Sequence, residues 1–245
     1  MSFKPIFEKG MIIRQHMLEA LRDYPYDFVQ ILFSQMGDGV ISGCKISVDG
    51  RERFAVSPGI VKINGELFFL TEQATLEFMD GINYVYIETR KEQAVDGTFY
   101  DTQIIEKKEQ DDSLFELFRY TRNAFVKEYS EIYELWGNVI NRIDRRFSQN
   151  SVAGGSTLCE DYYKLFARYL LSQENADMRD VSFAYQCLDG VNCLDIIKAY
   201  FKTDELSNKQ VIQLMKSKAY SLEQMVGSDA GMKTERKAEK KMYIS

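Results

Sequence analysis

The stretch 39–65, GVISGCKISVDGRERFAVSPGIVKING, decides the fold of the N-terminal half of the chain. Asp49-Gly50 and Asn64-Gly65 are dipeptides that reach positive φ at low cost, as a two-residue hairpin turn requires, and each lies between alternating apolar runs. Pro58-Gly59 interrupts the strand pattern between them, because proline cannot donate a hydrogen bond to a sheet ladder. The stretch therefore predicts antiparallel strands with two hairpins and a turn or bulge at Pro58-Gly59.

The same pattern extends on both sides of this stretch. Short runs rich in Val, Ile, Phe and Tyr, separated by Gly, Asp and Asn, recur from Phe28 to Ile105 at spacings too short for helices. We therefore predict a β-rich platform domain over residues 1–110, with an antiparallel sandwich-like or barrel-like architecture. The expected strands are Phe28–Ser34, Val40–Val48, Arg53–Val56, Ile60–Ile63, Leu67–Leu70, Leu76–Phe78, Tyr84–Glu88 and Phe99–Ile104.

The C-terminal half, residues 111–245, is predicted to be helical, so that the fold class is α+β with a C-terminal helical bundle. A charged stretch at residues 106–112 has the composition of a linker, and Ser113 with Glu116 forms a capping-box pattern. A long first helix is expected over about residues 114–147. Its apolar seam has an average period of 3.5 residues, which favours a partner helix either in the same bundle or in another subunit. The seam consists of Phe125, Tyr129, Ile132, Trp136, Val139 and Ile143.

Shorter helices are predicted after a loop at Ser148–Ser156. Thr157 with Glu160 and Ser207 with Gln210 repeat the capping-box pattern at two helix starts, and the last helix is expected to reach about Val226. The helices between them are expected at Ala176–Leu188, ended by Gly190, and at Asn192–Phe201, capped by Asn192. A basic tail closes the chain, with Lys233, Arg236, Lys237, Lys240 and Lys241.

Composition and residue counts favour a binding protein over an enzyme. The chain has 245 residues, a net charge of -6 and 45% hydrophobic residues, which is enough to bury one large or two modest cores. His16 is the single histidine, so a histidine-rich zinc site and a pair of catalytic histidines are both excluded. The four cysteines lack metal-ligand spacing, and the P-loop and GxSxG patterns do not occur. We expect no catalytic residue, no metal and no cofactor.

The same features restrict the partners and the location. Neither half of the chain is basic overall, which disfavours nucleic acid as a partner. No run approaches the roughly 18 apolar residues of a membrane span, and no signal-peptide pattern opens the chain. The cysteines Cys44, Cys159, Cys187 and Cys193 have the scattered spacing of reduced thiols. We therefore expect a cytoplasmic protein without direct membrane insertion.

Two stretches resemble a known class of proteins. The segment 7–17, FEKGMIIRQHM, resembles the opening of the type VI secretion baseplate adaptor family, in which an aromatic residue, Gly-Met, apolar residues, Arg and a Gln-His pair open a shoulder-like β domain. The segments 39–44 and 54–65 resemble β motifs of phage tail and baseplate proteins. The residues that carry the likeness are Phe7, Gly10, Met11, Arg14, Gln15, His16, Pro58, Gly59, Asn64 and Gly65.

The resemblance implies a function in assembly. It predicts a noncatalytic structural or adaptor subunit of a phage-tail-like contractile injection apparatus, associated with the baseplate or the tail. Its partners would be other baseplate or tail proteins, and the chain itself would form a homo-oligomer such as a trimer. The alternative is a cytoplasmic scaffolding or regulatory protein unrelated to injection machinery.

Overall fold

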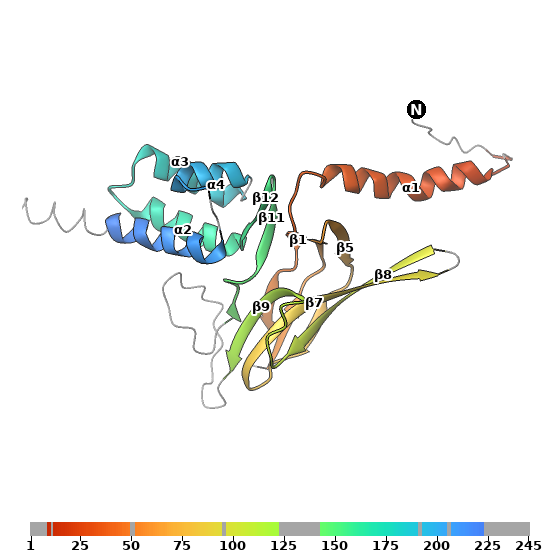
Figure 1. Ribbon diagram of the computed structural model, residues 1–245, viewed down its shortest axis with the longest axis horizontal. Coiled ribbons are helices and arrows are strands. Elements are labelled where there is room, and N and C mark those ends of the chain that lie inside the picture. The colour runs from red at the N-terminus through yellow and green to blue at the C-terminus, as the bar shows by residue number, and fades with distance from the viewer. Residues whose placement is uncertain are drawn as a thin grey trace, which may run out of the picture. The chain divides into compact units, whose positions relative to one another are not determined.

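The computed structural model describes residues 9–10, 12–49, 52–94, 97–122, 143–190, 193–204 and 207–222. By its internal contacts the chain divides into two units, Met1–Met36 and Gly37–Ser245. The first unit contains the helix α1, and the second contains all the strands and the C-terminal helices (Figure 1). The α+β class is confirmed, but the strands form three separate sheets in place of the expected sandwich or barrel.

The first unit is built on α1, which spans Gln15–Leu32. Arg14 precedes it with an extended backbone, and Pro25 lies inside it. The predicted strand at Phe28–Ser34 is therefore wrong. Met17, Leu21, Tyr24, Phe28 and Ile31 recur at intervals of four and three residues, which is helical spacing, and the short apolar run at its end gave a misleading strand signal.

The second unit begins with a five-stranded sheet in the order β12-β11-β1-β4-β5. β1 pairs in parallel with β11, and its other neighbour β4 is antiparallel. Strands from before residue 71 and after residue 148 thus share one sheet. Their bounds are Gly39–Gly43 for β1, Gly59–Ile63 for β4, Glu66–Leu70 for β5, Gln149–Val152 for β11 and Gly155–Leu158 for β12. The predicted loop at Ser148–Ser156 is wrong, because it contains β11 and the start of β12.

A bent hairpin links this sheet to a second one. β1 pairs with β4, while β2 (Ile46–Asp49) pairs with β3 (Arg53–Val56), so both legs of the hairpin pass from one sheet to the other. The bend lies at Gly43 and Cys44, with φ of 71° and 50°, opposite Pro58 and Gly59. Cys44 N–H donates to the Pro58 carbonyl at 3.2 Å. The break predicted at Pro58-Gly59 is confirmed, and the second sheet is completed by β6 (Ala74–Glu77) in the order β2-β3-β6.

The third sheet has the order β10-β9-β7-β8 and carries a long arm. β7 (Gly81–Ala94) pairs with β8 (Gly97–Lys107) from Tyr84 to Ala94, but with β9 (Phe115–Arg122) only from Gly81 to Ile87. The outer part of β7 and β8 therefore extends past β9 as a two-stranded ribbon (Figure 1).

The prediction of a helix at about residues 114–147 is wrong in the parts of that segment that the structure describes, because they belong to the third sheet. Residues 115–122 form β9, and β10 spans Ile143–Asp144. The capping box at its start is also absent: Ser113 N–H and Oγ both bond Asp111, and Glu116 pairs with Arg119 at 2.7 Å. The spacing of Ser and Glu occurs here in a turn and a strand, because pairing with β7 satisfies the backbone groups of residues 115–122.

Four helical segments follow the strands: α2 (Glu160–Ser172), α3 (Met178–Asp189), α4 (Leu194–Phe201) and residues 208–222. The Ser207–Gln210 capping box is confirmed, with Ser207 N–H donating to Gln210 Oε1 at 2.8 Å and Gln210 N–H to Ser207 Oγ at 3.3 Å. Gly190 ends α3 at φ of 133°, as predicted. Asn192, predicted to cap the next helix, lies outside the described residues.

The Thr157–Glu160 capping box is wrong. Thr157 is still part of β12, where it faces Asn150, and its hydroxyl contacts Tyr163 Oη at 2.6 Å. Cys159 takes the N-cap position of α2, without a side-chain cap bond. The helix itself forms, since its apolar positions pack against the other helices.

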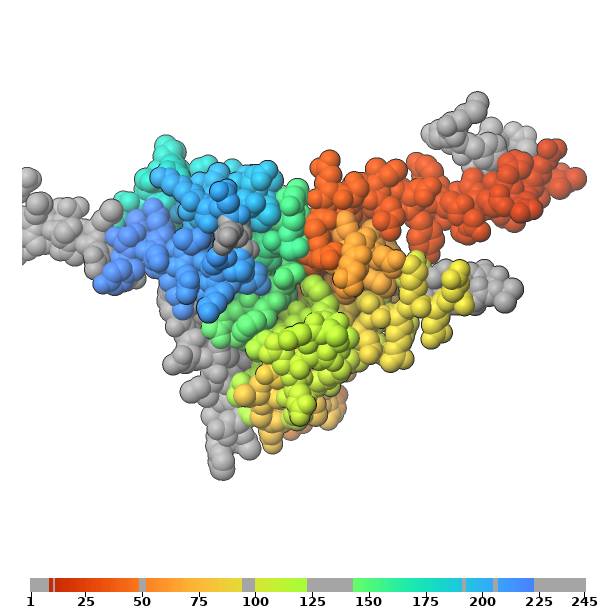
Figure 2. Space-filling model, viewed as in Figure 1, coloured from red at the N-terminus to blue at the C-terminus, as the bar shows by residue number. Residues whose placement is uncertain are grey.

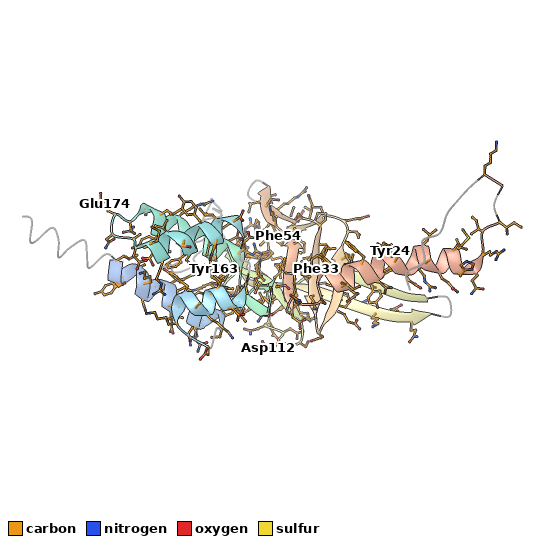
Figure 3. The ribbon with its side chains drawn as sticks, turned by 90° about the horizontal axis from the view of Figure 1, so that it is seen from above. Tyr24, Phe33, Phe54, Asp112, Tyr163 and Glu174 are labelled. Carbon is orange, nitrogen blue, oxygen red and sulfur yellow. The ribbon has the colours of Figure 1, made fainter. Side chains whose placement is uncertain are left out.

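The second unit has two hydrophobic cores. Phe54 is fully buried in the first, among the strands, where its ring meets Phe118 edge-on at 5.3 Å. Tyr163 is fully buried in the second, among the helices. Figure 3 labels both residues, one in each core. The strands, most of which come first along the chain, thus form one core, and the helices that follow form the other. β10 to β12 connect the two cores.

Candidate interaction site

An apolar stripe runs along α1, and all of its side chains except that of Met17 are exposed. Leu21, Tyr24, Phe28 and Ile31 have 50%, 62%, 55% and 74% of their surface exposed, and they follow the buried Met17 at heptad spacing. Leu18 and Leu32 flank this row and are also exposed, so the stripe is wider than a single seam. We call the set Met17, Leu18, Leu21, Tyr24, Phe28, Ile31 and Leu32 the α1 stripe; α1 is drawn in red to orange in Figure 2, and Tyr24 is labelled in Figure 3.

The opposite face of α1 is polar. Gln15 donates to Glu19 at 2.7 Å, and Arg22 pairs with Asp23 at 2.5 Å on the surface. This pair raises the pKa of Arg22 and lowers that of Asp23. A helix with one apolar and one charged face buries the apolar face against something else. We therefore expect the α1 stripe to pack against another apolar surface.

The N-terminal residues of the family-like motif lie where this helix begins. Gly10 adopts φ of 87° in a turn, a conformation that glycine reaches without a steric cost. Arg14 is the N-cap, and Gln15 and His16 open the helix. Phe7 and Met11 lie outside the described residues. The described residues of this motif therefore lie at the start of α1.

The second group of motif residues lies in the other unit. Asn64 and Gly65 have φ of 52° and 78°, which confirms a two-residue turn between β4 and β5. Asp38 holds this turn: its Oδ2 accepts from Asn64 N–H at 3.0 Å and its Oδ1 from Gly65 N–H at 2.9 Å. This role of Asp38 could not be predicted from the sequence, because 26 residues separate it from Asn64.

Residues 37 and 38 also contact the β11–β12 hairpin. Ser151 Oγ donates to the Gly37 carbonyl at 2.5 Å, and Ser156 Oγ donates to the Asp38 carbonyl. A Cβ on Gly37 would lie 2.3 Å from the carbonyl carbon of Gly155, so only glycine fits this approach. The segment thus ties the turn at one edge strand of the five-stranded sheet to the hairpin at the other.

The predicted helical seam is mostly untested. Phe125, Tyr129, Ile132, Trp136 and Val139 lie outside the described residues. Ile143 is described, and it contradicts its predicted place in a helix interface. It pairs with Tyr120 in the third sheet and is 4% exposed, within the β core.

A polar cluster links β10 to α2. The Asp144 carboxylate is 5% exposed and accepts two charged bonds from Arg146, one from Nη2 at 2.6 Å and one from Nε at 2.9 Å. Tyr162 Oη also reaches Asp144 at 3.3 Å, and burial is the main reason that the pKa of Tyr162 is raised. Arg145 pairs with Asp161 at 2.5 Å. These bonds fix the junction of the two cores, a role that the Asp-Arg-Arg run did not reveal in the sequence.

The buried thiols are poorly suited to nucleophilic chemistry. Burial raises the pKa of Cys44 to about 11 and those of Cys159 and Cys187 to about 12. At neutral pH these groups remain thiols, whereas the thiolate is the nucleophile and the metal ligand. Within the described ranges, no three His, Cys, Asp or Glu side chains gather as a metal site would need, and no helix is long and apolar enough to cross a membrane.

No family model matches the chain, and no curated protein matches it. A chain of the type VI secretion TssK-TssF-TssG baseplate subcomplex is similar to it over 86% of this chain and 80% of that one, with a TM-score of 0.33 and 11% identity. The crystal structure of TssK is similar over 86% of this chain and 59% of its own length, with a TM-score of 0.27 and 11% identity. The structural neighbours are thus type VI secretion baseplate proteins, at a low level of similarity.

Proposed function

We propose that this protein is a noncatalytic structural subunit that assembles through the α1 stripe. The observation that carries the proposal is the exposed row of large apolar side chains on a helix that belongs to a unit of its own. Contiguous exposed apolar surface on this scale is typical of an interaction site. The raised pKa values of the buried thiols support the noncatalytic part, because these cysteines stay protonated at neutral pH.

The partner that best fits the stripe is α1 of a second copy. Met17, Leu21, Tyr24, Phe28 and Ile31 alternate at intervals of four and three residues, the period at which two or more identical helices pack side by side. Charged residues Glu19, Arg22 and Asp23 lie off this row. Each Leu, Ile or Phe that becomes fully buried contributes about 1.5 to 3 kcal/mol. Because α1 has only 18 residues and contains Pro25, it gains most of its stability from such packing.

The apparatus in which this assembly takes part is proposed from the resemblance of residues 7–17 and 39–65. A baseplate or tail subunit of a contractile injection apparatus needs a rigid β platform and a surface for assembly. The second unit supplies strands tied together by Asp38, and the first supplies the α1 stripe. Sheath, tube and baseplate genes beside the gene for this chain would support the assignment, and their absence would favour an unrelated scaffold.

Assembly can be tested by light scattering on the full chain across a range of concentrations. The wild type is expected to form a multimer, and the Leu21→Glu/Ile31→Glu variant a monomer, because four carboxylates in a dimer would have to be desolvated. The matched control is Tyr26→Glu/Gln30→Glu, which adds the same charge to exposed positions off the heptad row. A wild type that stays monomeric, or a stripe variant that assembles like the control, would overturn assembly through α1.

A further inference from the structure

A basic cleft lies in the second unit, where the β hairpin meets the last helix. It has a volume of about 730 Å³. One side is lined by Arg146, Phe147, Gln149 and Ser156, and the other by Ser207, Asn208, Lys209, Ile212, Gln213 and Lys216. The green and blue surfaces of these two segments adjoin in Figure 2. Volumes of this size are typical of ligand-binding clefts.

The charge of the cleft is opposite to that of the chain. Arg146, Lys209 and Lys216 line it, and none of the residues that line it is a carboxylate, although the chain as a whole carries -6. Lys209 and Lys216 are exposed and form no ion pair with the described residues. Their charge is therefore available to an anionic ligand.

Arg146, the third cation of the cleft, is held in place by hydrogen bonds. Asp144 binds its Nε and Nη2, and no bond from its Nη1 group is formed within the described ranges. Arg146 lines the cleft, so this group is a donor for a ligand there. Asn208 Nδ2 donates to the carbonyls of Arg146 and Ser148, at 3.1 and 3.0 Å. These bonds tie the first turn of the helix to the opposite wall, so the cleft is preorganised and loses little entropy on binding.

The cleft also has an apolar part. Ile212 lies in it at 8% exposure, and the Phe147 ring is 48% exposed. The Arg119 guanidinium stacks on Phe147 at 3.5 Å from the ring centre, which orients the ring. The helix 208–222 also starts here, and the positive end of its dipole adds to the attraction for an anion.

We propose that this cleft binds a short acidic peptide segment of a partner protein, with Asp or Glu side chains on the three cations and an apolar side chain against Phe147 and Ile212. Three cations with an apolar anchor fit a peptide better than a nucleic acid, because a nucleic-acid footprint follows several phosphates along a longer basic track. The site does not involve α1, so it is independent of assembly through the α1 stripe.

The test uses the full chain and a fluorescein-labelled peptide in which Asp and Glu alternate around a central Phe. Fluorescence anisotropy at low salt is expected to show saturable binding that weakens as salt is added. Lys209→Glu/Lys216→Glu should reduce affinity by about tenfold or more, because two favourable charge contacts become repulsive. The matched control, Lys9→Glu/Lys45→Glu, changes the net charge equally at exposed lysines that do not line the cleft and should bind like the wild type.

Two further measurements separate the acidic peptide from other anions. Phe147→Ala should weaken binding of the peptide with a central Phe and leave that of a peptide with a central Ala unchanged. Circular dichroism confirms that each variant is folded. Equal binding by the wild type and the Lys209/Lys216 variant would overturn the proposal. Displacement of the peptide by inorganic phosphate or by a single-stranded oligonucleotide, either of them at a lower concentration than the unlabelled peptide requires, would also overturn it.

Discussion

Asp38 offers a sharp test of how the β platform is held together. The Asp38→Ala variant removes the carboxylate that accepts from Asn64 N–H at 3.0 Å and from Gly65 N–H at 2.9 Å. A hydrogen bond to a charged group contributes about 1.5 to 3 kcal/mol, and less where water can replace the partner. Asp38 is half-buried, so we expect a loss of about 2 kcal/mol for the two bonds together. In a protein of this size, that corresponds to a fall in Tm of roughly 4 to 8 °C.

Hydrogen exchange locates the effect. The amides of Asn64 and Gly65 should exchange faster in Asp38→Ala, while amides in α3 keep their protection. Asp38→Asn keeps one acceptor oxygen and should lose about half as much stability, roughly 1 kcal/mol. The matched control is Asp112→Ala. The exposed carboxylate of Asp112 accepts from the nearby Gln110 side chain at 2.7 Å, its one bond among the described residues. Loss of less than about 0.5 kcal/mol in Asp38→Ala, with unchanged exchange at the turn, would refute the argument.

Two further variants test the bend and an exposed ion pair. Gly43→Ala places a Cβ 2.0 Å from the Pro58 carbonyl oxygen at φ of +71°, so chemical denaturation should show a loss of about 2 kcal/mol or more. A Cβ at Gly65 meets no atom within 4 Å, so Gly65→Ala should lose less stability. Lys107 lowers the pKa of Asp111 to about 2, and this depressed pKa contributes stability above the ordinary carboxyl pKa that is lost as the pH falls toward 2. Lys107→Met should raise the Asp111 pKa in an NMR titration, and an unchanged value would show that Ser113 alone sets it.

The features that could be predicted from the sequence are turns and helix ends, which depend on residues close together in the chain. The Asn64-Gly65 turn, the Ser207–Gln210 box and the end of α3 at Gly190 all depend on residues within four positions of one another. The prediction of a long helix at 114–147 was wrong because residues 115–122 pair with β7, whose first residue lies more than 30 positions earlier. Nothing in the segment itself records that pairing.

The candidate sites divide in the same way. The α1 stripe could have been found, because residues 17, 21, 24, 28 and 31 alone specify it. The short strand signal at Phe28–Ser34 concealed it. The basic cleft could not have been found, since it joins residues 146–149 to residues 207–216 through bonds from Asn208.

The two proposed contacts depend on different forces, and salt separates them. The α1 stripe is apolar, so association through it should persist or strengthen as salt increases. The cleft attracts its ligand through Arg146, Lys209 and Lys216, and the Debye length falls from about 10 Å at 0.1 M salt to about 3 Å at 1 M. A chain that remains multimeric in 1 M salt while releasing an acidic peptide would therefore have two independent contacts. Loss of both together would instead show that the peptide binds only where copies of the chain meet.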